Sequence, residues 1–217
     1  MNRREFLTAT AKILAATATF GMLPDFAEAA RKDKNKNAKE ADKVQKYELP
    51  PLESLIKFED LGIGKVNLEF KEMDVRDYTG AVVIHHAGLR KDVDIDVPAI
   101  HDMHLGNDWS GIGYHFVVHK DGFIEQGRPL EYVGAHALGN NLYTVGICLT
   151  GNYSLNLPPR EQVLAAEQLT AALCQKYNFK PSDTTIFGHR ELCATDCPGN
   201  KFFPYLPEFI KNVAQVF

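Results

Sequence analysis

Residues 188–199 read Gly188-His189-Arg190-Glu191-Leu192-Cys193-Ala194-Thr195-Asp196-Cys197-Pro198-Gly199. This stretch holds His189 and Cys197, whose side chains are both common zinc ligands. Their separation is too long for one face of a helix and too short for two separate elements. It fits a strand end followed by a loop that folds back, with Pro198 and Gly199 making the turn. On spacing alone the pair can equally be a polar strand-end residue and a packed cysteine, so a metal site needs further ligands.

Composition and charge limit the classes of protein that this chain can be. The chain has 217 residues, of which 45% are hydrophobic, which fits one globular domain with appendages. Residues 1–46 hold ten of the 24 Lys/Arg and six of the 28 Asp/Glu, which leaves 14 basic and 22 acidic residues and a formal charge of −8 on the remainder. An acidic body argues against nucleic acid as a partner. The four Cys are too few for a disulfide scaffold and lack the paired CxxC spacing of structural zinc.

The N-terminus has the three-part layout of an export signal. Arg3 and Arg4 precede a weakly apolar stretch over residues 13–23, and residues 27–29 read Ala-Glu-Ala, a small-x-small cleavage pattern. We therefore predict a twin-arginine signal peptide over residues 1–29 and a charged linker over residues 30–48, ahead of a domain over residues 49–217. The alternative is an amphipathic first helix that belongs to the fold. The export interpretation places the mature protein in the periplasm or outside the cell, with no stable membrane insertion after the signal is removed.

The body of the chain begins with a strongly β-forming run, residues 81–86, that ends in two histidines. Side chains alternate along a strand, so His85 and His86 should face opposite sides and only one can join a given metal site. Residues 92–108 look polar and irregular. His101 and His104 in that segment have helical spacing, but solvated loop histidines are a more ordinary interpretation than a metal site.

The remaining pattern predicts a mixed α/β fold, with a central mixed β-sheet flanked by α-helices. Strands are expected over 113–119, 123–126, 144–150 and 184–187, with a hairpin turn over 120–122. Apolar residues recur at helical spacing over 161–177, and a closing helix is expected to begin near Pro207.

With these motifs in place, the chain resembles the zinc-dependent N-acetylmuramoyl-L-alanine amidases of the type 2 family, which includes phage amidase lysozymes and animal peptidoglycan recognition proteins. The resemblance covers residues 82–204, and the amidase-like domain is residues 49–217. It rests on four motifs in order: Val83-Ile84-His85-His86; Gly113-Tyr114-His115-Phe116-Val117; residues 134–141 with 145–152; and Gly188-His189-Arg190 through Cys197-Pro198-Gly199. The chain lacks the Cys pair that follows the first His in the animal members.

The resemblance implies a zinc site and a reaction. The family's zinc ligands fall on His85, His189 and Cys197, and its two catalytic positions fall on Tyr114 and Thr195. The implied activity is hydrolysis of the amide between the lactyl group of N-acetylmuramic acid and L-alanine, in peptidoglycan or muropeptide fragments. Both hydroxyls would donate to the oxyanion, and Tyr114 is also a candidate general base if its pKa is lowered. We take His136 and Asn141 as candidate substrate-binding residues, with support of the metal ligands as the alternative for both and a structural role as a further alternative for His136.

Two other classes of function stay open from the sequence. One is a muropeptide-binding module without turnover, and the presence of Cys197 argues against it because non-catalytic recognition proteins typically replace that ligand. The other is a zinc-stabilised structural domain, against which three ligands count because structural zinc sites usually have four. We expect a monomer.

Overall fold

The computed structural model describes residues 52 and 54–217, which lie within one compact unit, Glu48–Phe217. The predicted signal peptide over residues 1–29 and the whole predicted linker over residues 30–48 lie outside the described residues. Of the helices in the described part, none is both long enough and apolar enough to cross a bilayer.

A six-stranded sheet forms the centre of the described unit, in the order β1-β4-β3-β5-β2-β6. The β3–β4 pair is antiparallel and all other neighbouring strands are parallel, which confirms the predicted mixed sheet. The strands are β1 Gly64–Lys65, β2 Ala81–His86, β3 Phe116–Val118, β4 Ile124–Gln126, β5 Thr144–Leu149 and β6 Ile186–Gly188.

The strand β2 lies between β5 and β6, and this position explains its sequence. A parallel strand covered on both faces needs a continuous apolar run rather than an alternating one. Residues 81–84 read Ala-Val-Val-Ile, and all four are buried. The apolar run therefore ends where the strand delivers its two histidines to the edge of the sheet.

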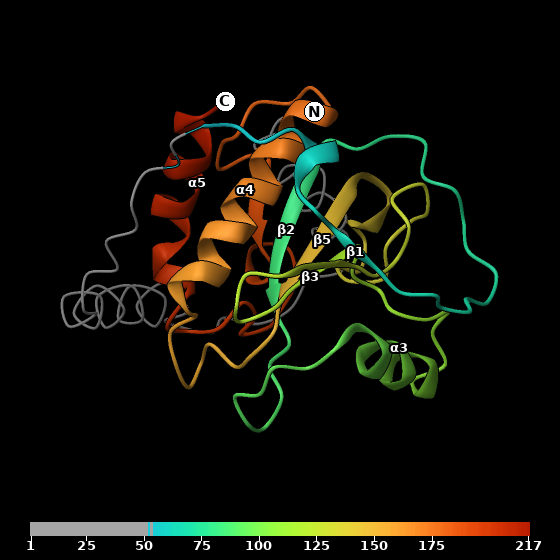
Figure 1. Ribbon diagram of the computed structural model, residues 1–217. Coiled ribbons are helices and arrows are strands. Elements are labelled where there is room, and N and C mark those ends of the chain that lie inside the picture. Colours follow the sequence, from blue (N-terminus) through green and yellow to red (C-terminus); the bar gives the residue numbers. More distant parts are fainter. Residues whose placement is uncertain (1–51, 53) are drawn as a thin grey trace, which may run out of the picture. The chain divides into compact units, whose positions relative to one another are not determined.

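Two helices cover one face of the sheet. The helix α4, Arg160–Lys176, packs against β2, β3 and β5, and α5, Leu206–Gln215, lies beside α4 (Figure 1). The first was predicted from its apolar spacing and the second was expected to begin near Pro207, and both are confirmed to within one residue at their starts. Short 3-10 turns complete this part of the chain: η1 Phe58–Asp60, η2 Asn141–Tyr143, η3 His189–Glu191 and η4 Phe203–Tyr205.

The prediction that residues 92–108 are irregular was wrong, because they contain the helix α3, Val97–Gly106. The Asp96 side chain accepts a hydrogen bond from the backbone N of Ala99 at 2.8 Å, and Pro98 lies in the first turn. Asp at the N-cap followed by Pro is a strong helix start. Val97 and Ile100 are the apolar residues that anchor the helix to the core.

The helix α3 packs on the face opposite α4, and this face carries the site. Neighbouring strand residues face opposite sides: Phe116 meets Phe58 with ring centroids 5.9 Å apart, whereas Val117 packs in one cluster with α3. In the register of the parallel strands, Val117 pairs with Cys148 and Cys148 pairs with His85. His85 therefore lies on the α3 side of the sheet.

Candidate metal centre

The first candidate ligand, His85, is placed by strand alternation. His86 points to the other face, where its Nδ1 accepts a hydrogen bond from the backbone N of Tyr153 at 3.0 Å. His85 is fully buried on the α3 face, near the C-terminal end of β2. Only one of the two adjacent histidines is thus available to a metal site on that face.

The other two candidate ligands come from the loop that follows β6. His189 begins η3 directly after the strand, and the chain then folds back until the backbone N of Arg190 donates to the carbonyl of Cys197 at 2.9 Å. The Arg190 guanidinium also donates to Asn200 Oδ1 at 2.8 Å and to the carbonyl of Asp196. Arg190 therefore fixes both ends of the loop that carries Cys197.

The structure brings His85, His189 and Cys197 together, and we call these three residues the metal centre. One ligand atom from each lies within 4.8 Å of the others. Zinc–ligand bonds at tetrahedral angles would hold a ligating nitrogen and sulfur about 3.6 Å apart. The distance from His85 Nδ1 to Cys197 Sγ is 3.6 Å, so the donor set and this spacing both fit zinc.

Burial sets the protonation of these groups. Desolvation lowers the pKa of His85 well below its ordinary value and also lowers that of His189, so both imidazoles are neutral at pH 7. Burial raises the pKa of the Cys197 thiol to about 12. Neutral imidazoles are ready to bind a metal, whereas Cys197 must release a proton when it does so.

The two predicted catalytic hydroxyls lie at different depths. The Tyr114 ring centroid is 5.1 Å from that of His85, and burial raises the pKa of Tyr114, with smaller contributions from Cys148 and Cys197. The phenol therefore keeps its proton, which favours a hydrogen-bond donor over the general base considered from the sequence. Thr195 is exposed on the loop before Cys197, and its Oγ1 accepts from the backbone N of Cys197 at 3.2 Å.

The two predicted substrate-binding residues lie beside the metal centre and contact protein groups. His136 is 7% exposed, and its Nδ1 lies 3.1 Å from Nε2 of His85. Burial lowers the pKa of His136 to about 3, so its ring is neutral. Asn141 Oδ1 accepts from the backbone N of His136 at 2.9 Å and from that of Ala137 at 2.8 Å. Asn141 thus holds the backbone that presents His136.

Three other histidines have protein partners away from the metal centre, whereas His115 packs against His136 with ring centroids 5.6 Å apart. His101 Nδ1 accepts from Ile112 N at 3.2 Å, and His104 Nδ1 accepts from Gly113 N at 2.9 Å. Both tie α3 to the segment that precedes β3. His119 lies between two carboxylates, with Nδ1 3.0 Å from Asp94 and Nε2 2.9 Å from Glu125.

Sequence reasoning missed three residues near the site. Trp109 is 41% exposed, and its ring centroid is 4.6 Å from that of His104, which in turn neighbours Tyr114 at 5.5 Å. The other two are Arg190, described above, and Thr144, whose hydroxyl lies 3.4 Å from His136 Nε2. Only Trp109 was detectable, because it is the single tryptophan of the chain.

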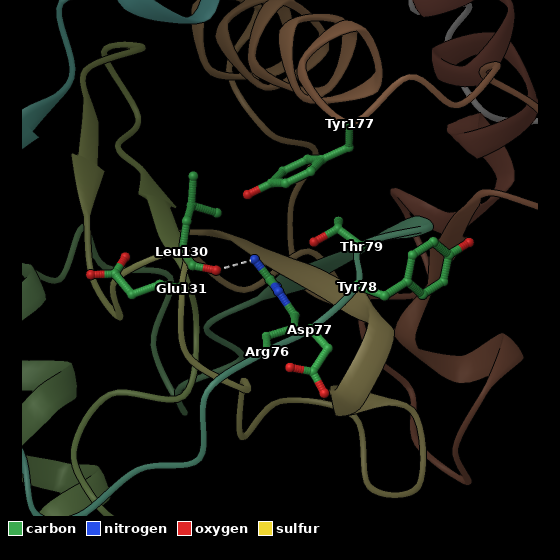
Figure 2. A pocket seen from close by; sticks show the side chains of 7 residues that line it. All are labelled: Arg76, Asp77, Tyr78, Thr79, Leu130, Glu131 and Tyr177. Carbon is green, nitrogen blue, oxygen red and sulfur yellow. Dashed lines mark hydrogen bonds between the residues drawn. The ribbon is translucent and has the colours of Figure 1, made fainter.

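A separate pocket of about 510 Å³ lies next to the start of β2, whereas His85 is near the strand's other end (Figure 2). Arg76 lines this pocket and donates to the carbonyls of Leu130 and, at 2.9 Å, Thr144. None of the predicted site residues lines this pocket. Its lining is Arg76, Asp77, Tyr78, Thr79, Leu130, Glu131 and Tyr177.

The family model and a human relative that match this chain carry the same description. Residues 76–200 match the family model described as N-acetylmuramoyl-L-alanine amidase. A human N-acetylmuramoyl-L-alanine amidase is 36% identical over 108 residues, which are 48% of this chain and 19% of the human protein. The chain thus spans about a fifth of the length of that relative.

Solved structures of this kind resemble the fold closely. The amidase LysC from Clostridium intestinale superposes with a TM-score of 0.63 at 33% identity, covering 71% of this chain and 98% of LysC. Drosophila PGRP-LB superposes with a TM-score of 0.58 at 30% identity, covering 70% of this chain and 91% of PGRP-LB. The residues that match the family model, 76–200, include all three residues of the metal centre.

Proposed function

The chain belongs to the N-acetylmuramoyl-L-alanine amidase family, and we propose that it is a zinc-dependent peptidoglycan amidase. The bond that it cleaves is the amide between the lactyl group of N-acetylmuramic acid and L-alanine of the stem peptide. Its substrates are peptidoglycan or muropeptide fragments. LysC, which this chain covers almost completely, carries the amidase name and supports this assignment.

The observation that carries the proposal is the three-residue donor set. His85 at the end of β2 meets His189 and Cys197 from the segment after β6, with ligand atoms within 4.8 Å of one another. Catalytic zinc sites use three protein ligands and keep one position open, whereas structural zinc sites usually close with four. In the described part of the chain, these three are the only His, Cys, Asp or Glu side chains grouped closely enough to hold a metal ion.

Zinc bound there would polarise the scissile carbonyl and lower the pKa of a bound water. The protein's own groups then supply hydrogen bonds. Tyr114 lies beside His85 and keeps its proton, so its hydroxyl can donate to the oxygen on which negative charge develops. Thr195 has an exposed hydroxyl on the loop that carries Cys197, and this hydroxyl is the second proposed donor. The loss of one such donor costs roughly 3 kcal/mol in the transition state.

Muropeptide fragments are the proposed partner because of what relatives bind. A variant of Drosophila PGRP-LB has been solved in complex with tracheal cytotoxin, and its wild-type form is 30% identical to this chain. The exposed ring of Trp109, near Tyr114 through His104, offers an apolar surface for a glycan or peptide.

A muropeptide-binding module without turnover is the second candidate. It is supported by the recognition proteins among the structural relatives, one pair of which binds tracheal cytotoxin as an ectodomain complex. The intact donor set favours the enzyme, since binding alone has no need of a thiolate at Cys197.

The decisive experiment follows turnover of a defined muropeptide by mass spectrometry, with and without a chelator. We expect about one zinc per chain, products that separate at the lactyl–alanine bond, and loss of turnover after chelation. Cys197→Ser should lose both zinc and turnover. Cys193→Ser is the matched control on the same loop and should keep both. Binding of the muropeptide with no product in the zinc-loaded protein would instead establish the binding module.

We also propose that the protein is exported by the twin-arginine route to the periplasm or the outside. The support is Arg3-Arg4, the weakly apolar stretch over residues 13–23 and the cleavage pattern over residues 27–29. These residues lie outside the described structure, so the proposal rests on the sequence.

A further inference from the structure

A buried chain of hydrogen bonds leads away from the metal centre through His136. His85 Nε2 lies 3.1 Å from His136 Nδ1, and His136 Nε2 lies 3.4 Å from the hydroxyl oxygen of Thr144. That hydroxyl lies 2.7 Å from the carbonyl oxygen of Asn140. The side chains of His85, His136 and Thr144 are all buried, so protein groups rather than bulk water decide where each proton lies.

The Asn140 carbonyl fixes the direction of the whole chain. A carbonyl only accepts, so the single hydroxyl proton of Thr144 is donated to it over the short 2.7 Å contact. Toward His136 the hydroxyl can then only accept, and His136 must carry its proton on Nε2. Its Nδ1 is left as an acceptor, so His85 donates from Nε2.

If every hydrogen bond in the chain ran in the opposite direction, fewer polar groups would have a hydrogen-bond partner. If Thr144 donated to His136 over 3.4 Å, the Asn140 carbonyl would lose the hydroxyl proton 2.7 Å away. His85 would then carry its proton on Nδ1, which lies 3.6 Å from Cys197 Sγ. That tautomer would place a proton where a metal ion must bind.

We propose that His136 is a positioning residue that holds His85 in the Nε2-protonated tautomer and so leaves Nδ1 free to bind the metal. The inference rests on the proposed metal centre. It replaces the substrate-binding role expected for His136 with one that acts through His85. Outer-shell partners of this kind typically change metal affinity by about tenfold to a hundredfold.

The backbone around His136 is shaped to receive its ring. A Cβ added at Gly134 would lie 2.5 Å from the ring, and one added at Gly146 would lie 2.6 Å from it. Any side chain at either position would therefore displace the imidazole. Asn141 holds the backbone that carries the ring, because its side-chain oxygen accepts hydrogen bonds from the backbone N of His136 and of Ala137.

The test reads the tautomer directly in chelator-treated, ¹⁵N-histidine-labelled full-length protein. Nitrogen chemical shifts distinguish protonated from unprotonated ring nitrogens, and we expect His85 with Nε2 protonated. Thr144→Val removes the hydroxyl that accepts from His136 Nε2 and keeps only the backbone of Thr144 beside the ring, so the share of His85 protonated on Nδ1 should rise. Thr144→Ser keeps the hydroxyl and should preserve the wild-type pattern. His136→Phe removes the acceptor for His85, and His136→Asn restores an acceptor oxygen near the position of Nδ1.

Zinc affinity, measured by competition with a chromophoric chelator, is the second readout. We expect His136→Phe and Thr144→Val to bind zinc about tenfold to a hundredfold more weakly, with recovery in His136→Asn and Thr144→Ser. His85 protonated on Nδ1 in the wild type, or an unchanged tautomer and affinity in folded His136→Phe, would overturn the proposal. A wild-type protein with the expected tautomer but no zinc binding would support the role of His136 and refute the proposed function.

Discussion

At the scale of single residues, a substitution of Tyr114 should change the turnover rate without changing the amount of bound zinc. Its ring neighbours His85, and its raised pKa makes it a donor at neutral pH. Tyr114→Phe removes the hydroxyl and keeps the ring, so zinc content should stay at the wild-type level. The turnover rate should fall roughly a hundredfold or more.

Two comparisons sharpen this prediction. Tyr78→Phe changes an exposed tyrosine in the other pocket and should leave turnover unchanged. Thr195→Ala should lower the rate less than Tyr114→Phe does, because Thr195 is exposed and a water molecule can replace its hydroxyl as a donor. Wild-type turnover in a zinc-loaded Tyr114→Phe variant would remove Tyr114 from the proposed mechanism.

The sequence identified the residues of the metal centre but not the contacts that support them. His85, His189 and Cys197 were predicted from motifs, and the structure places them together. The link from His136 to Thr144 could not be predicted, because it depends on how the loop before η2 approaches β5. The hydrogen bonds by which Arg190 holds the loop around Cys197 could not be predicted either, because no periodic pattern marks an arginine in a loop.

At the scale of elements, the N-cap of α3 is expected to contribute measurably to the stability of the protein. Asp96→Ala removes the hydrogen bond to Ala99 N, so the free energy of unfolding should fall by about 1 kcal/mol. Asp96→Ser keeps a capping oxygen and should recover most of the loss. Denaturant unfolding of the three proteins measures this, and equal stabilities would show that the cap contributes nothing.

The helix α3 also shows why apolar periodicity alone does not predict every element. The long helix α4 and the strand β2 have strong periodic or continuous apolar patterns, and both were predicted with nearly correct bounds. The helix α3 has only ten residues, and its three buried residues include a histidine, His101, which reads as polar. Its start was nevertheless encoded in Asp96 and Pro98, a local signal that outweighs weak periodicity.

At the scale of the whole molecule, the packing of α4 against α5 makes stability depend on pH. Glu167 on α4 is fully buried and accepts from Asn212 on α5 at 3.0 Å. Burial raises its pKa from 4.5 to about 8, with a further contribution from Glu208. Between these values the unfolded chain loses the proton while the folded chain keeps it, so stability falls as pH rises, by at most about 1.4 kcal/mol per pH unit.

Glu167→Gln should remove this dependence because the amide does not ionise and its oxygen can still accept from Asn212. Relative to wild type, the variant should gain on the order of 3 kcal/mol between pH 5 and pH 8. Glu161→Gln alters an exposed acid on the same helix and should show no such gain. Parallel stability–pH curves for wild type and Glu167→Gln, measured by denaturant unfolding, would contradict the assignment.

The chemistry of the metal centre gives a reason for the proposed export route. Cys193 and Cys197 are free thiols four residues apart on one loop, and an oxidising compartment could join them and remove a ligand. The twin-arginine route carries folded proteins, and folding forms the proposed zinc site, so metal bound in the cytoplasm would protect Cys197 during transfer. Replacing Arg3 and Arg4 together by Lys should therefore leave folded, zinc-loaded and active protein in the cytoplasmic fraction. Arg31→Lys, beyond the predicted cleavage site, should be exported normally with a mature chain that begins near Ala30. Normal export of the double variant, or an exported chain that still carries Met1, would refute the route.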